Sequence, residues 1–126
     1  MSKIYTSYYA KVANIREPAI LVRISQSQPA WFGKPMIQLP QVYPTWDMVT
    51  NYKQGNISWA EYTQKYNRLL EAVGISEIRD TLLCIVVKYK LPIVLVCWER
   101  SGTNCHRHLL AEKLQMGIVE LTTELD

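Results

Sequence analysis

The amino-acid sequence predicts a single α/β domain, residues 1–126, in which helices flank a small, mostly parallel central sheet in three layers. Apolar residues run almost unbroken through 19–24 and 93–97, as expected of strands that are covered on both faces. Between these strands, residues 58–89 show apolar positions that recur at helical intervals instead. The chain therefore contains both buried strands and amphipathic helices, which is the pattern of a parallel sheet with flanking helices.

The N-terminal part predicts two strands and a short connection. Residues 3–7 form the first expected strand, with a polar end at Thr6 and Ser7, and residues 19–24 form the second. The link between them, residues 8–18, is short for a parallel crossover, which usually needs about a dozen residues or more. We therefore expect one irregular or short helical turn there, and the pairing of the two strands stays open.

Residues 26–43 predict a long structured loop. Three prolines and one glycine fall within it, and no hydrophobic period survives. Loops of this length are often functional lids. Trp31, Phe32 and Lys34 could stack on a nucleobase and pair with a phosphate. The alternative is that the aromatic residues only pin the loop to the core.

Two helices are expected after this loop. The first covers residues 44–54 and is ended by Gly55. The second begins at Ser58, which has capping-box spacing to Glu61, and ends at Gly74. Its apolar residues form one stripe, namely Trp59, Tyr62, Tyr66, Leu69, Leu70 and Val73.

A third helix and a final strand–helix–strand unit complete the prediction. The helix is capped by Ser76 and ends before Pro92. The unit covers residues 93–97, 104–116 and 118–122, and the helix stops before a glycine. A right-handed crossover makes its two strands parallel.

Composition limits the function classes. The 48% hydrophobic and 20% charged residues are those of a globular protein, and a net charge of +3 favours an anionic ligand only if it is concentrated. No apolar run approaches about 20 residues, and the start Met-Ser-Lys-Ile-Tyr-Thr has no signal-peptide layout. Cys84 and Cys97 lie inside aliphatic runs, so we expect free thiols in a reducing cytoplasm and no disulfide.

The strongest site signal is the start of the helix at 104–116. With Asn104 as the cap, Cys105, His106 and Arg107 occupy the first three helical positions. Their backbone N–H groups have no intrahelical acceptor, and the helix dipole adds partial positive charge. A guanidinium suits phosphate or carboxylate, so the sequence predicts an anion site at this turn.

The helical period predicts where Arg107 points. Leu110 and Leu114 follow it by three and seven residues along the core-facing stripe, so Arg107 should emerge at the end of the sheet and not in open solvent. The alternative is a structural clasp in which Arg107 pairs with Glu99.

Two kinds of chemistry are candidates at this turn. Cys105 would have a lowered pKa beside Arg107 and could act as a nucleophile, although most cysteines at such positions only pack. Cys97 should be buried at the end of its strand and is not a stronger candidate for reactivity than Cys105. His106 and Glu99 could titrate as an acid and a base.

A metal is not expected from the spacing. His106 and His108 are two residues apart on a helix and point to opposite sides, with His108 in solvent. A zinc site would need Cys97, Cys105, one histidine and a fourth ligand, and this spacing resembles no standard finger.

Other polar residues should reach the same end of the sheet. Thr6 and Ser7 end the first strand, and Arg23 and Ser25 end the second. Hydroxyls and a guanidinium at neighbouring strand ends suit an oxyanion or a sugar. Closure of local turns is the alternative for each of them.

These motifs together resemble a known family. Residues 94–99 read Val-Leu-Val-Cys-Trp-Glu, and residues 105–112 read Cys-His-Arg-His-Leu-Leu-Ala-Glu. With residues 6–11, 24–25 and 29–32, they resemble the shorter branch of a bacterial and phage family, domain of unknown function 488. The resemblance covers nearly the whole length of the chain.

The resemblance implies a fold and a site. The fold is an α/β sandwich, and the site residues are Cys97, Glu99, Cys105, His106 and Arg107. It implies no established activity. This chain departs from the longer branch after the first strand, where that branch has a full helix.

The first functional expectation is a binding protein that holds a small anionic, nucleotide-derived ligand at the strand ends, under the Trp31 loop, and sequesters it. The alternative is a hydrolase or transferase acting on a nucleotide or glycosidic substrate, with Glu99 and His106 as acid and base. Direct nucleic-acid binding is a weaker alternative, because the charge is modest and no Lys/Arg stripe exists. We expect no cofactor and no association with a membrane, and the sequence leaves open whether the protein forms a homo-oligomer.

Overall fold

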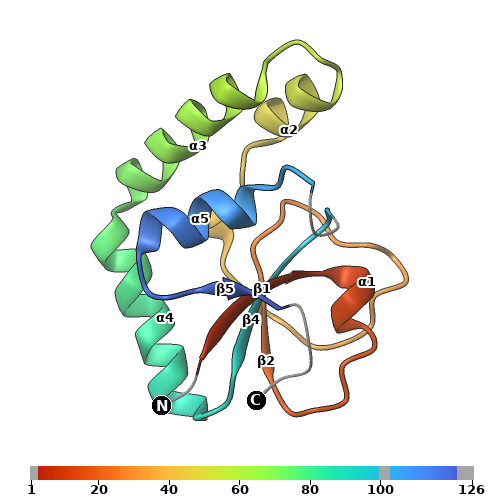
Figure 1. Cartoon of the computed structure of the whole chain (residues 1–126), viewed down its shortest axis with the longest axis vertical. Helices are drawn as coiled ribbons and strands as arrows, with labels where there is room; N and C mark the ends of the chain where they lie inside the picture. Colours follow the sequence, from red (N-terminus) through yellow and green to blue (C-terminus); the bar gives the residue numbers. More distant parts are fainter. Residues whose placement is uncertain (1–2, 100–102, 122–126) are drawn as a thin grey trace.

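The computed structural model describes residues 3–99 and 103–121. They form a five-stranded, all-parallel sheet in the order β3-β2-β4-β1-β5 (Figure 1). The strands are β1 (Ile4–Tyr8), β2 (Ile20–Arg23), β3 (Ile37–Gln38), β4 (Ile93–Cys97) and β5 (Val119–Glu120). The predicted α/β class is confirmed.

The order of the strands settles the pairing that the sequence left open. β4 lies between β1 and β2, with Ile93 in register with Ile4 on one side and with Ile20 on the other. The connection between β1 and β2 contains the one-turn helix α1 (Tyr9–Val12), which confirms the expected short helical turn. Because β1 separates β4 from β5, the two parallel strands of the final unit are not neighbours.

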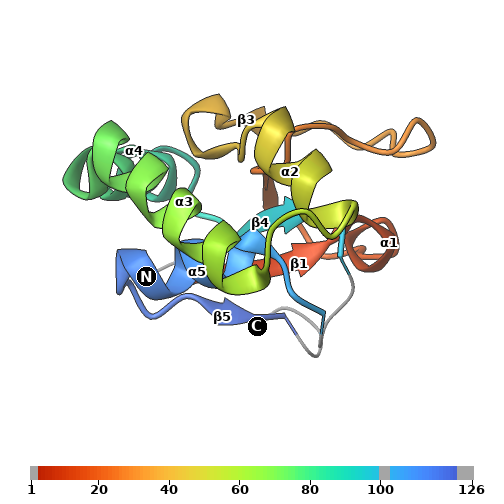
Figure 2. The same ribbon diagram turned by 90° about the horizontal axis from the view of Figure 1, so that it is seen from above.

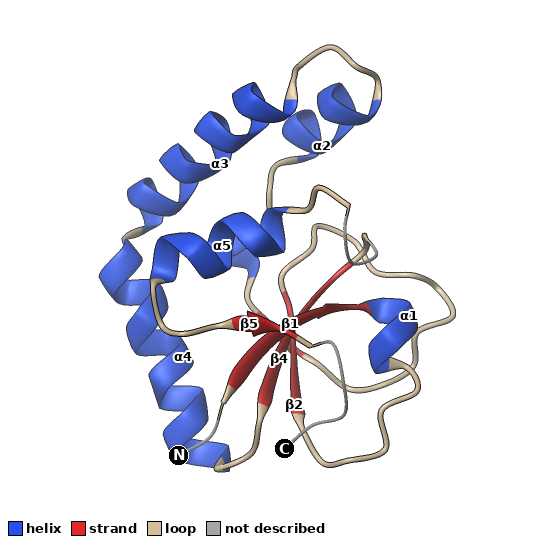
Figure 3. Cartoon of the chain, in the orientation of Figure 1, coloured by secondary structure: helices blue, strands red, loops and turns tan. Residues whose placement is uncertain are grey.

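The helices lie on both faces of the sheet. Figures 2 and 3 show the sheet between the long helices and the short α1. The remaining helices are the 3-10 turn η1 (Pro40–Val42), α2 (Trp46–Lys53), α3 (Trp59–Val73), α4 (Ile75–Tyr89) and α5 (His106–Leu114). None of the helices among the described residues is long and apolar enough to cross a membrane.

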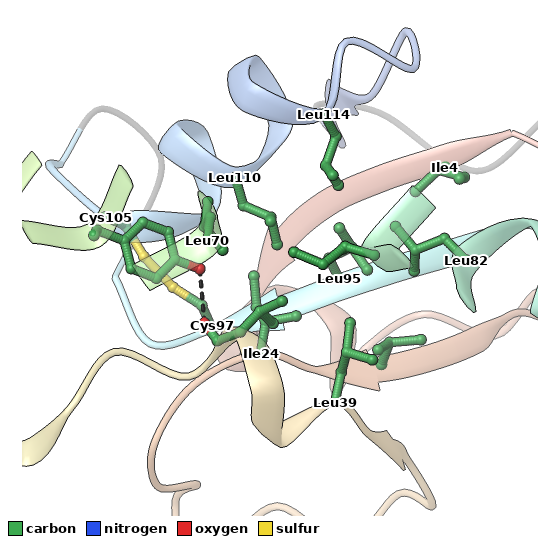
Figure 4. Packing of buried hydrophobic residues seen from close by; sticks show 14 of the residues in the cluster. Ile4, Ile24, Leu39, Leu70, Leu82, Leu95, Cys97, Cys105, Leu110 and Leu114 are labelled. Atoms are coloured by element: carbon green, nitrogen blue, oxygen red, sulfur yellow. Dashed lines mark hydrogen bonds between the residues drawn. A yellow bond between two sulfur atoms is a disulfide. The ribbon is translucent and has the colours of Figure 1, made fainter. Parts of the chain in front are cut away.

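Two hydrophobic clusters sandwich the sheet, and β4 belongs to both. Ile93, Leu95 and Cys97 pack with residues of α2–α5, whereas Val94 and Val96 pack with α1 and Phe32. This alternation is what a central strand covered on both faces requires. Figure 4 shows Leu110 and Leu114 of α5 over Leu95. Because Phe32 packs with Val94 and Val96 in the second cluster, it attaches the 26–43 loop to the core.

The structure corrects several helix boundaries. The Ser58–Glu61 capping box is present, as predicted, but α4 begins at Ile75 with Gly74 as its N-cap, so Ser76 lies inside the first turn. Likewise α5 begins at His106 with Cys105 as its N-cap, one residue after the predicted Asn104. Neither Gly74 nor Cys105 makes a side-chain cap hydrogen bond. The nearby polar residues Ser76 and Asn104, of types that usually cap helices, therefore predicted the wrong helix starts.

Two further boundaries differ. The loop 26–43 contains the two-residue β3 and the η1 turn and is otherwise irregular. The last strand is shorter than the predicted 118–122, and Thr122 lies outside the described residues, as do residues 100–102 of the polar loop before α5.

Candidate functional site

A cavity of about 200 Å³ opens at the carboxyl end of β4, beside the N-terminus of α5. This is the edge of a parallel sheet where ligands bind in open α/β folds. Helices α2 and α3 provide its outer wall. The described residues that line it are Ser25, Gln26, Ser27, Pro44, Trp46, Val49, Tyr52, Lys53, Trp59, Tyr62, Cys97, Trp98, Glu99, Thr103, Asn104, Cys105 and His106.

Aromatic side chains form most of the outer wall. Tyr62 stacks on Trp59 with ring centroids 5.0 Å apart, and Tyr52 lies 5.4 Å from each of them. On the opposite side, the indole Nε1 of Trp98 donates to the Ser27 carbonyl at 2.8 Å, which fixes the ring. Burial, chiefly, raises the pKa of Tyr62, so its hydroxyl is protonated at neutral pH.

A disulfide between Cys97 and Cys105 lies on the inner side of the cavity (Figure 4). The expectation of free thiols is therefore wrong for these two residues, and Cys84 is free and exposed. The aliphatic runs correctly indicated that Cys97 is buried, but burial alone does not say which thiols meet. The fold brings the last residue of β4 against the N-cap of α5.

His106 is buried beside this disulfide in a defined tautomer. Its Nε2 lies 2.7 Å from the carbonyl oxygen of Ile24, and a carbonyl can only accept, so Nε2 carries the hydrogen. Nδ1 then presents a lone pair 3.8 Å from the Cys105 Sγ and 4.0 Å from the Cys97 Sγ. Burial, helped by the nearby Arg107 charge, lowers the pKa of His106 to about 4, so the ring is neutral at pH 7.

Arg107 lies behind the cavity and is completely buried. Its Nε and Nη2 donate to the two carboxylate oxygens of Glu120 at 3.0 and 2.9 Å. Its Nη1 donates to the Glu99 carbonyl and lies 3.7 Å from the Cys97 Sγ, and the guanidinium sits over the ring of Tyr8. Arg107 is not among the described residues that line the cavity.

This arrangement corrects the expectation that Arg107 opens onto a ligand. The helical period correctly kept the side chain out of solvent. The alternative of a structural ion pair is correct, but the carboxylate that pairs with Arg107 is Glu120 of β5. Glu99 accepts from Arg107 only through its backbone carbonyl. His108, expected in solvent, is partly buried, and burial lowers its pKa as well.

The structure brings five of the predicted residues together at the cavity and separates the others. Those at the cavity are Ser25, Cys97, Glu99, Cys105 and His106. Ser25 Oγ is 2.6 Å from both the Tyr9 hydroxyl and the Ser27 carbonyl, so its contacts are largely internal.

The other predicted strand-end residues are absent from the cavity lining, namely Thr6, Ser7 and Arg23. Thr6 Oγ1 donates to Glu120, and the fully buried Ser7 Oγ has no hydrogen-bond partner among the described residues. Arg23 donates to the backbone carbonyls of Ser25 and Gln26. The alternative of local turn closure is therefore correct for Arg23.

The three loop residues proposed for stacking and charge, Trp31, Phe32 and Lys34, also lie outside the cavity lining. Trp31 is exposed and contacts Phe32 edge-on. Lys34 donates to the Ile15 carbonyl at 2.6 Å. The 26–43 loop therefore contributes the cavity residues Gln26 and Ser27 near its start, and the Trp31 segment does not cover the cavity.

Sequence reasoning missed the α2 and α3 residues of the cavity. Trp59 and Tyr62 were assigned only to a core stripe, and Trp46, Tyr52 and Lys53 were not singled out. A signal was present, because Trp46, Val49 and Lys53 recur at helical spacing on one face of α2. In the structure this face keeps Trp46 58% exposed.

The described residues form an α/β domain with a candidate ligand site at the carboxyl ends of its strands. A family model described as "Active DUF488-N3 subclade" matches residues 11–117. The chain therefore belongs to the DUF488 family, as its motifs implied. No match was found among curated proteins or among solved structures.

Proposed function

We propose that the protein binds a small anionic, nucleotide-derived ligand in the aromatic cavity. The observation that supports this most directly is the set of tryptophans at one small cavity, Trp46, Trp59 and Trp98. Stacking of a base on an aromatic side chain contributes about 1–3 kcal/mol. A volume of about 200 Å³ is below the usual range of about 300–1,000 Å³, so the cavity suits one ring system with the rest of the ligand at the rim.

The charges at the rim suggest where the phosphate of such a ligand lies. Lys53 is an exposed cation of the cavity lining, and the N-terminus of α5 adds partial positive charge. Glu99 lines the cavity as well and would repel an anion placed next to it. The proposal therefore puts the phosphate near Lys53, whereas Arg107 supports the site from behind.

The test is a ligand panel that also detects turnover. The protein is incubated with nucleoside monophosphates, cyclic dinucleotides and NAD, and the mixture is analysed before and after denaturation. Intact ligand released only on denaturation supports binding. Product that accumulates with time supports an enzyme. Absence of both, for every compound at millimolar concentration, contradicts the nucleotide assignment.

Trp46→Ala is expected to weaken nucleotide binding about tenfold or more, because it removes one stacking surface. Trp31→Ala is the matched control, since Trp31 is similarly exposed, 61% against 58%, but does not belong to the cavity lining. Titration calorimetry of both variants measures the effect. Equal losses in the two variants, or a loss confined to Trp31→Ala, would contradict the site.

A second candidate function is a hydrolase or transferase. Glu99 and His106 both belong to the cavity lining, the Nδ1 of His106 is unprotonated, and the matched subclade is described as active. A base with a pKa of about 4 takes up a proton poorly at neutral pH, which is why binding is our first proposal.

Glu99→Gln separates these two functions. Under the enzyme alternative it should abolish turnover. Under the binding proposal it should leave nucleotide affinity unchanged or raise it, because a carboxylate beside an anion is removed. The same ligand panel gives both readouts, and a large loss of affinity without any wild-type turnover would contradict both assignments of Glu99.

We further propose a cytoplasmic location and a role in sequestering a nucleotide signal in a bacterium or phage. The mild net charge of +3 supports a small ligand over a nucleic acid, and Lys53 is the exposed cation among the described residues of the cavity lining. The competing outcome, nucleic-acid binding, would appear as affinity that grows with oligonucleotide length and falls steeply with salt.

A further inference from the structure

Three metal-ligand atoms converge on the inner side of the cavity. The Sγ atoms of Cys97 and Cys105 and the Nδ1 of His106 all lie within 4.8 Å of one another, and all three residues are buried. The sequence argument against a metal rested on the spacing of known zinc fingers. The fold brings these groups together from the end of β4 and the start of α5.

The His106 ring has the arrangement of a metal-binding imidazole. Such a ring usually donates its second N–H to a carboxylate or a backbone carbonyl, which fixes the tautomer and the orientation of the ring. Here the Nε2–H donates to the Ile24 carbonyl, and the free Nδ1 lone pair faces both sulfurs. A histidine with a purely structural role needs only the hydrogen bond from Nε2 and no group facing its Nδ1 lone pair.

The backbone and the neighbouring guanidinium also suit two separate thiolates. The Cα atoms of Cys97 and Cys105 are 7.6 Å apart, beyond the usual 4.4–6.8 Å for bridged cysteines, so two unbonded sulfurs fit the same backbone. Arg107 Nη1, 3.7 Å from the Cys97 Sγ, supplies a donor to a thiolate at that position.

We propose that Cys97, Cys105 and His106 form a transition-metal site of the zinc type when the disulfide is reduced. Two thiolates and one imidazole are a soft donor set that suits Zn²⁺. Because all three residues belong to the cavity lining, the fourth coordination position faces the cavity, as in sites that keep a position for water or a ligand. The inference holds whichever ligand the cavity takes.

Reduction of the disulfide makes both sulfurs available to the metal. A dithiol reductant gives two electrons and two protons to the Cys97–Cys105 bond and becomes a cyclic disulfide. Zn²⁺ then displaces the two thiol protons, forming two Zn–S bonds and one Zn–N bond. His106 releases no proton, because its Nδ1 carries none. In the reverse direction a small-molecule disulfide accepts the two electrons and, with two protons from solvent, becomes two thiols, while the Cys97–Cys105 bond re-forms and the ion is released.

The test uses Co²⁺ as a spectroscopic probe in the Cys84→Ser background, since Cys84 is a free, exposed thiol that would bind metal adventitiously. Reduced, anaerobic protein is expected to bind one Co²⁺ per chain. Thiolate-to-cobalt charge-transfer bands and the visible bands of a tetrahedral ion should appear and be displaced by Zn²⁺. The disulfide form should show neither set of bands.

Ligand variants make the assignment specific. Cys105→Ser should reduce the charge-transfer intensity by about half, and His106→Ala should weaken Co²⁺ binding by about tenfold or more while the thiolate bands remain. Circular dichroism checks that each variant is folded, and Cys97→Ser replaces Cys105→Ser if the latter unfolds. The proposal is overturned if reduced protein with two titratable thiols shows no thiolate bands, or if binding survives loss of both cysteines.

Discussion

Replacing Arg107 with methionine is expected to lower the free energy of unfolding by about 3–5 kcal/mol, which is typical for loss of one member of a buried ion pair. The fully buried guanidinium holds both carboxylate oxygens of Glu120 and the Glu99 carbonyl, and it lies over the ring of Tyr8. Methionine can replace much of the volume but none of the hydrogen bonds. Urea denaturation monitored by circular dichroism measures the change.

Lys113→Met is the control. Its pair with Glu71 has the same length, 2.9 Å, but both side chains are partly exposed, so the expected loss is at most about 1 kcal/mol. Arg107→Met combined with Glu120→Gln should be less destabilised than the sum of the single variants, with a coupling of about 1–3 kcal/mol. Similar effects of Arg107→Met and Lys113→Met would contradict the structural role of Arg107.

Stability of the disulfide-bonded protein is expected to fall by about 3 kcal/mol between pH 6.5 and pH 4 because of His106. Its pKa is about 4 in the folded chain against an ordinary value of 6.5, so the unfolded state binds the proton more tightly in this window. The contribution is fully present above pH 6.5 and is lost as the pH falls toward 4. Denaturation at several pH values, with a chelator present, measures it.

The control is the same pH series on His106→Asn. Carboxylates titrate in both proteins, so the difference between the two curves isolates His106. His108→Asn removes the only other histidine, whose pKa is also lowered, and should flatten the curve by a smaller amount. A difference curve for His106→Asn that is flat from pH 6.5 to 4 would show that His106 is not held neutral by burial.

The parts of the fold that local patterns determine could be predicted from the sequence. β4 matches its predicted residues because five consecutive apolar side chains have one use in a small α/β domain, a strand covered on both faces. α3 begins where its capping box indicated. The starts of α4 and α5 were wrong by one or two residues because neither helix uses a side-chain cap.

The site was harder to predict because it depends on contacts between distant segments. The stripe through Leu110 and Leu114 correctly placed Arg107 on the inner face of its helix, but its partner Glu120 is brought there by β5, whose neighbour in the sheet is β1. The cavity is closed by α2 and α3, and their position depends on how these helices pack. The apolar period of a helix shows which face is buried but not what that face packs against. The Cys97–Cys105 bond depends on the same kind of proximity.

Fluorine NMR of protein labelled with 5-fluorotryptophan tests the proposed cavity most directly. The chain has four tryptophans, of which Trp46, Trp59 and Trp98 belong to the cavity lining and Trp31 does not. Single Trp→Phe variants assign the four resonances. Addition of a nucleotide retained in the panel should shift the resonances of Trp46, Trp59 and Trp98 and leave that of Trp31 in place. A bound nucleotide that shifts Trp31 alone, or none of the four, would contradict the account.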